Sequence, residues 1–106
     1  MLIAAAFLAL QTVNWMHHPD FEAARLAFEA CANGAIDAAA AGEAEEQAVA
    51  RAMYACSREA AAVRAVMIRL DGEHWGGVAM EAFADIQRGD LTRRLQARRA
   101  GLPPPL

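Results

Sequence analysis

The chain has 106 residues, 57% of them hydrophobic, and a formal net charge of −3 at pH 7. This length suits a single domain with its own core, and so small a net charge does not by itself indicate a class of partner. All ten positively charged side chains are arginines. The absence of lysine excludes a P-loop and Schiff-base chemistry.

Much of the hydrophobic content is alanine, the best helix former. No stretch alternates apolar and polar residues with the period of two that a half-buried strand requires. We therefore predict an all-α fold, a small elongated helical bundle of four to five helices around one long central helix at about residues 43–70. Residues 1–101 are expected to form a single helical domain, and residues 102–106 a short proline-rich tail.

The N-terminal stretch from Leu2 to Met16 is almost entirely apolar and predicts a helix buried on most sides. Gln11, Thr12 and Asn14 interrupt it, so it falls short of the ~20 apolar residues that a bilayer span needs. A signal peptide would begin with basic residues, which are missing here. We predict no membrane span and a cytoplasmic location. The sequence leaves open whether this helix packs within the chain, in a dimer or against a partner.

A second helix is expected to begin with Asp20 as its N-cap and to end at Asn33–Gly34. Its buried stripe, with apolar residues three and four positions apart, consists of Phe21, Ala24, Phe28 and Cys31.

Cys31 and Cys56 both lie at apolar positions of predicted helices. We favour two free thiols that are buried as small hydrophobic side chains. A single disulfide, and a metal or redox role, are the alternatives. Since no His or Cys pair has the spacing of a local zinc motif, we predict neither a metal nor a cofactor.

The long helix at residues 43–70 carries a seam of apolar residues in alternating steps of four and three: Val49, Met53, Cys56, Ala60, Val63, Met67 and Leu70. Most of these side chains are small or flexible, which favours the spine of an intramolecular bundle over a coiled coil. Such a helix would be ~42 Å long, whereas a compact domain of this size is only ~35 Å across. The excess length favours a homodimer.

Asp71–Gly72 is expected to end the long helix. A fourth helix at 74–87 would follow, with Gly76–Gly77 permitting close approach of a neighbouring backbone. Its predicted core stripe is Trp75, Ala79, Ala82 and Ile86. Gly89 should end this helix, and a fifth should run from Asp90 to about Ala100, with Gly101 as its terminator.

The segment from Asp71 to Trp75 gathers two carboxylates, an imidazole and an indole, and is the best local candidate for acid–base chemistry. Helix-stop and helix-start preferences explain the same residues more simply. Ser57, the only serine, has no neighbouring base. We therefore predict that the chain is not an enzyme.

The C-terminal helix gathers five arginines, which are the predicted partner-binding residues: Arg88, Arg93, Arg94, Arg98 and Arg99. Leu91 and Leu95 lie one turn apart, so the helix can dock through its leucines and present guanidinium groups outward. The arginines could instead pair with acidic residues of the chain itself.

We expect a non-catalytic protein-interaction module: an adaptor, assembly factor or inhibitor of the kind that small phages or operons encode. It would bind a larger protein partner with an acidic surface. The alternative is a nucleic-acid-binding regulator that uses the Arg-rich helix at 88–99, although the overall acidity of the chain weakens this interpretation.

Overall fold

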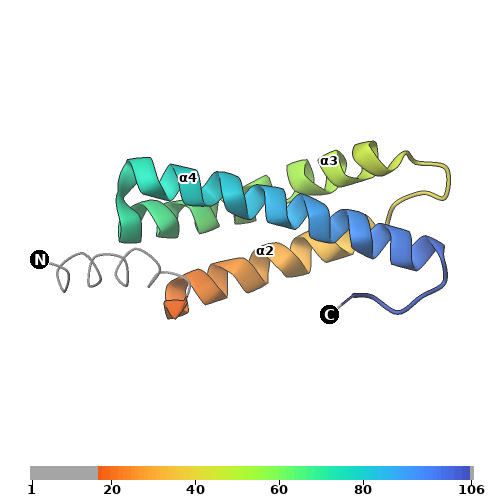
Figure 1. Cartoon of the computed structure of the whole chain (residues 1–106), viewed down its shortest axis with the longest axis horizontal. Coiled ribbons are helices and arrows are strands. Elements are labelled where there is room, and N and C mark those ends of the chain that lie inside the picture. The colour runs from red at the N-terminus through yellow and green to blue at the C-terminus, as the bar shows by residue number, and fades with distance from the viewer. Residues whose placement is uncertain (1–16, 106) are drawn as a thin grey trace, which may run out of the picture.

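The computed structural model describes residues 17–105, which form three helices: α2 (Pro19–Asp37), α3 (Glu45–Ala55) and α4 (Ser57–Arg99) (Figure 1). The all-α prediction is confirmed, with no strand anywhere in that range. The expected count of four to five helices is not matched. The helix predicted at Leu2–Met16 lies outside the described residues. None of the described helices is long and apolar enough to cross a bilayer.

The long helix α4 reverses direction at Gly72, which has φ 87° and ψ 167°. Only glycine adopts this backbone conformation without a large steric cost. Figure 1 shows two antiparallel arms, which we call the N-arm (57–71) and the C-arm (73–99). The predicted break at Asp71–Gly72 is confirmed, but helix resumes directly after it.

The single central helix predicted at 43–70 is wrong. α3 ends at Ala55, and α4 begins at Ser57. Between them Cys56 has φ −105° and ψ 25°, and its side chain is bonded to α2. The seam residues nevertheless face inward: four of them are buried and three are partly buried, in chain order Val49, Met53, Cys56, Ala60, Val63, Met67 and Leu70.

A disulfide joins Cys31 of α2 to Cys56, with a Cα–Cα distance of 5.9 Å. This corrects the expectation of free thiols: the two apolar positions meet when α2 packs against the junction of α3 and α4. The sequence separation is 25 residues. A loop of that length restricts the unfolded chain enough to stabilise the fold by about 3 kcal/mol.

Two predicted helix ends do not occur. α2 runs past Gly34 to Asp37, and the C-arm runs past Gly89 to Arg99. A glycine inside a helix costs only about 1 kcal/mol, and burial of large apolar side chains in the following turn outweighs it. The start of α2 also differs, because His18 is the N-cap and its Nδ1 accepts a hydrogen bond from the Asp20 amide at 3.1 Å.

The predicted terminator at Gly101 is confirmed, with φ 73°. The Leu102 amide donates to the Ala97 carbonyl at 2.8 Å, and the Gly101 amide donates to the Arg98 carbonyl at 3.1 Å. These are the two hydrogen bonds of a Schellman motif.

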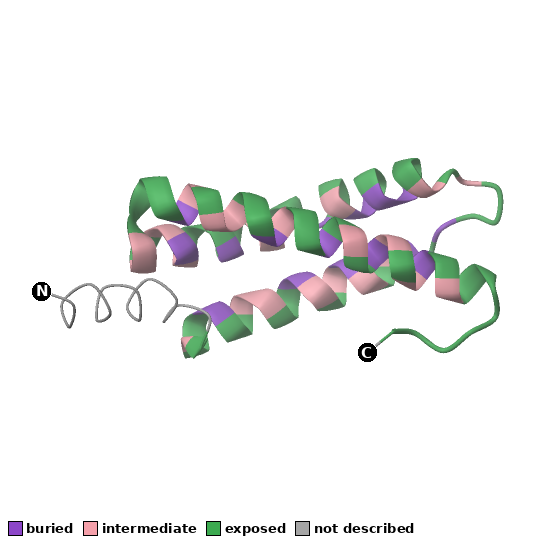
Figure 2. Ribbon diagram, viewed as in Figure 1, coloured by how far each residue is buried: buried purple, intermediate pink, exposed green. Residues whose placement is uncertain are grey.

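The core lies where the three helices face one another, as the buried positions in Figure 2 show. Its largest fully buried side chains are Phe28, Ile36, Cys56, Val63, Met67, Leu91 and Leu95. Phe83 of the C-arm packs edge-on against Phe21 and Phe28, with ring centroids 6.1 and 5.5 Å away. The stripe predicted on α2 and the docking of the C-arm through its two leucines are both confirmed.

Candidate functional site

Arg94, one of the five predicted partner-binding residues, holds the C-arm against the end of α2. Its Nε and Nη2 donate to the two carboxylate oxygens of Asp37 at 2.9 and 2.7 Å. This bidentate hydrogen bonding lowers the pKa of Asp37 below its ordinary value, against the opposing effect of burial. The same bonds raise the pKa of Arg94, so both groups stay charged near neutral pH.

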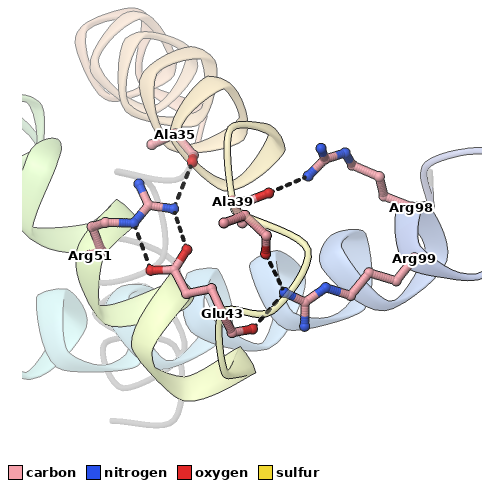
Figure 3. A network of polar contacts seen from close by, with 7 residues as sticks. Ala35, Ala39, Glu43, Arg51, Arg98 and Arg99 are labelled. Atoms are coloured by element: carbon pink, nitrogen blue, oxygen red, sulfur yellow. Dashed lines mark hydrogen bonds and ion pairs between the residues drawn. The ribbon is translucent and has the colours of Figure 1, made fainter.

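Arg98 and Arg99 bind the backbone of the loop between α2 and α3 (Figure 3). Arg98 donates to the Ala39 carbonyl at 3.4 Å, and Arg99 donates to the carbonyls of Ala40 and Glu43 at 3.0 and 2.6 Å. These guanidinium groups satisfy carbonyls that follow the end of α2.

Arg51 of α3 holds the same loop from the other side. Its Nε and Nη2 donate to the Glu43 carboxylate at 2.9 and 3.0 Å, and Nη2 also reaches the Ala35 carbonyl at 3.3 Å (Figure 3). The hydrogen bond from Arg51 lowers the pKa of Glu43. The loop is therefore held from α3 and from the C-arm at once.

The remaining two predicted residues, Arg88 and Arg93, have more than half of their side-chain surface exposed. Each pairs with an aspartate three positions earlier on the same helix, Asp85 and Asp90 respectively. The structure therefore separates the five predicted arginines into two groups. Three arginines bind residues near the end of α2, whereas these two face solvent.

The C-arm has its buried face rotated away from the predicted one. The residues that it buries are Gly76, Phe83, Gln87, Leu91 and Leu95. Gly76 explains the rotation, because a Cβ built there would lie 2.7 Å from the Ile68 Cα and 2.8 Å from its amide nitrogen. The two arms thus touch through backbone at this glycine, which confirms the close approach predicted from sequence.

Most of the stripe predicted as core is consequently exposed, although Ala79 is partly buried and packs against the core. Trp75 is 59% exposed, Val78 47% and Ile86 61%. Together with Ala79 and Ala82 they follow one another at helical spacings along one face of the C-arm. We call these five residues the apolar strip. Sequence periodicity detects this stripe, but only the packing of the arms shows that it faces outward.

A groove of about 460 Å³ runs beside the apolar strip, between α2 and the C-arm. Its lining combines apolar strip residues with side chains of both helices: Phe21, Arg25, Glu29, Ala79, Ala82, Phe83, Ile86, Gln87 and Asp90. The polar groups are bonded to one another: Arg25 donates to Glu29 at 2.7 Å, and Gln87 donates to the other oxygen of Glu29 at 3.1 Å. The groove therefore has a largely apolar lining, with a polar rim that includes Arg25, Glu29 and Gln87.

The predicted acid–base segment lies at the tip of the hairpin. His74 is exposed, and its ring packs edge-on against Trp75 at 4.8 Å between centroids. Glu73 and Gly72 are exposed as well. Glu73 and His74 also line an open hollow of about 520 Å³, together with Arg64 and Glu81. The helix-stop and helix-start interpretation of this segment stays a prediction.

Comparison with known proteins yields no relative: no family model, no curated protein and no solved structure matches the chain.

Proposed function

We propose that this chain is a non-catalytic protein-interaction module that docks an amphipathic helix of a larger partner protein along the apolar strip. The observation that supports this most directly is the exposure of Trp75, Val78 and Ile86 on one helix face beside a groove. Isolated exposed apolar residues are ordinary, but a contiguous set is typical of an interaction surface. Helices that dock in grooves use anchors at this spacing.

Charge indicates the chemistry of the partner helix. Arg93 lies seven positions after Ile86, on the same face of the C-arm, whereas Arg88, only two positions after Ile86, points to the other side of this helix. Both arginine side chains are more than half exposed, and each forms an ion pair with an aspartate of its own helix. A partner helix with acidic residues beyond its apolar anchors would complement Arg93. In this proposal Arg93 has the partner-binding role that the sequence predicted, and Arg88 has no contact with the docked helix.

The proposal can be tested with a photo-crosslinking residue placed at position 86 and, as a control, at position 54 on α3. Tyr54 is 83% exposed and lies outside the apolar strip. We expect a crosslinked adduct with the partner protein when the photo-reactive residue is at position 86, and none when it is at position 54. With the purified partner, Trp75→Ala should weaken binding at least tenfold, because buried tryptophans are frequent hot spots, whereas Tyr54→Ala should leave it unchanged.

Since Trp75 and Tyr54 are both exposed, neither substitution should lower the melting temperature appreciably. Equal binding by Trp75→Ala, Ile86→Glu and the unaltered chain would contradict the proposed surface.

The nucleic-acid alternative would use the two exposed arginines, Arg88 and Arg93. Labelled DNA and RNA at low salt provide the test, because phosphate contacts make binding fall steeply as salt rises. We expect no salt-dependent binding. Binding that disappears in the pair Arg88→Ala/Arg93→Ala would instead support the alternative, and this pair spares the arginines that hold the loop.

We also propose that the chain works in an oxidising compartment. The expected cytoplasmic location was consistent with free thiols, whereas the structure joins Cys31 to Cys56. Disulfides are rare in the cytosol, where thioredoxin and glutathione keep thiols reduced. Trapping with a thiol-alkylating reagent in intact cells would decide the point, since reagent on both cysteines would contradict it.

A further inference from the structure

Three potential metal ligands meet beside the core. Cys31, Cys56 and Glu59 each offer one donor atom, and these atoms all lie within 4.8 Å of one another. They come from α2, from the junction of α3 and α4, and from the first turn of α4. Cys56 and Glu59 are three positions apart, so a helix places them on the same face.

The carboxylate of Glu59 is incompletely satisfied. Its Oε2 atom is buried and has no hydrogen-bond partner, the one such side-chain atom recorded among residues 17–105. A buried carboxylate oxygen without a donor costs free energy. A cation bound between Glu59 and the two sulfur atoms would remove this cost.

We propose that, once the disulfide is reduced, Cys31, Cys56 and Glu59 bind a Zn²⁺ ion through two thiolates and one carboxylate. Thiolate sulfur and carboxylate oxygen are both ordinary zinc ligands, and zinc is usually four-coordinate. Three protein donors leave the fourth position for water or for a group from a partner.

A dithiol is the reductant that opens the disulfide in this proposal. The dithiol gives two electrons and two protons to the Cys31–Cys56 bond and becomes a disulfide itself. The two thiols then lose their protons to solvent as Zn²⁺ binds. Zn–S distances of ~2.3 Å place the two sulfur atoms ~3.8 Å apart, so both cysteine side chains would rotate when the disulfide is replaced by the metal ion.

Such a site would cross-link the same segments in both redox states. In the oxidised chain the link is the disulfide, and in the reduced chain it is the metal ion. Cys31 is partly exposed whereas Cys56 is fully buried, so the ion and the reductant would both approach from the α2 side.

Metal titration of the full chain tests this inference. The protein is reduced with a phosphine, which leaves no competing thiol, and titrated with Co²⁺ and then Zn²⁺. We expect one ion per reduced chain, a sulfur-to-cobalt charge-transfer band and the visible spectrum of tetrahedral Co²⁺. The oxidised chain should bind neither ion.

Glu59→Gln is the decisive variant because it keeps both cysteines. We expect it to form the disulfide normally and to bind Zn²⁺ at least about tenfold more weakly, since even outer-shell substitutions cost that much. Glu46→Gln, at an exposed position of α3, is the matched control and should bind as the unaltered chain does.

Any one of three titration results would overturn the proposal: no binding by the reduced chain at micromolar Zn²⁺, undiminished binding by Glu59→Gln, or equal binding by the oxidised chain. Circular dichroism of the reduced chain with and without Zn²⁺ accompanies each titration. Reduced protein that is unfolded and stays unfolded when Zn²⁺ is added would likewise overturn it.

Discussion

The pairing of Arg94 with Asp37 shows how one residue can serve the fold where the sequence indicated a binding role. The two residues are 57 positions apart, and their bidentate contact joins the C-arm to the last residue of α2. Asp37 is 41% exposed, so solvent screens the pair and its contribution to stability is about 0.5–1 kcal/mol.

This contribution should depend on pH. The hydrogen bond from Arg94 lowers the pKa of Asp37 from its ordinary value of 3.8. A lowered pKa in the folded state stabilises the fold above the ordinary value and is lost as the pH falls through the lowered one. We expect Asp37→Asn to reduce the free energy of unfolding by about 0.5–1 kcal/mol near neutral pH, with the difference vanishing well below pH 3.8.

Urea denaturation of both proteins across that pH range measures the effect. Asp90→Asn is the control, because its partner Arg93 is three positions away on the same helix and such pairs contribute only about 0.2–0.5 kcal/mol. A difference between Asp37→Asn and the unaltered chain that persists undiminished into acid would contradict the assignment.

Among the helices, the contact between the two arms of α4 depends on a glycine at one position and not at the next. A Cβ at Gly76 would meet the Ile68 backbone at under 3 Å, whereas a Cβ at Gly77 would meet nothing within 4 Å. We expect Gly76→Ala to destabilise the fold by about 2 kcal/mol, because the arms must separate. Gly77→Ala should stabilise it by about 0.5–1 kcal/mol.

Thermal melting of the two variants measures this difference. The substitutions are chemically identical and adjacent in sequence, so effects of the unfolded chain largely cancel. Equal melting temperatures for Gly76→Ala and Gly77→Ala would show that the arms do not meet as described.

Local signals in the sequence predict much of this architecture. Helical periodicity identifies the inward faces of α2 and of the final turns of α4, and glycine preferences identify the reversal at Gly72 and the end at Gly101. These predictions succeed because the causes lie within a few residues. The same preferences fail at Gly34 and Gly89, where burial of neighbouring side chains outweighs a local cost.

The candidate site is harder to predict because its causes are long-range. The C-arm has two apolar stripes, and the choice of the buried one depends on the backbone contact between Gly76 and Ile68. The disulfide is equally long-range, since a spacing of 25 residues does not by itself reveal a pairing. The sequence does not distinguish Arg94 from Arg93, because only the folded structure places Asp37 of α2 beside Arg94.

For the whole molecule, the expectation of a homodimer loses its original support. It rested on a central helix longer than the domain, but α3 ends at Ala55 and the chain reverses at Gly72. The seam is used inside the fold. A homodimer therefore stays a proposal, and the apolar strip is the surface we assign to it when no partner is bound.

Light scattering tests self-association. We expect the purified chain to approach twice its mass of 11.4 kDa as the concentration rises, and Ile86→Glu to return it to that of one chain, because a charge in the interface is costly. Tyr54→Ser should have no effect. A mass of one chain at every concentration would contradict the homodimer proposal. It would not bear on the proposed docking of a partner helix.

The loop held by the last turns of α4 has a consequence for the order of folding. Arg98 and Arg99 bind residues made 56 to 59 positions earlier, whereas the two cysteines are only 25 apart. On the ribosome, both sulfur atoms exist long before the C-arm is complete. Contacts between residues close in sequence form more readily than contacts between distant ones, so α2 can pair with the junction of α3 and α4 before the C-arm, with Leu91 and Leu95, packs against them. Folding of these three helices is therefore completed only after the last turns of α4 have been made.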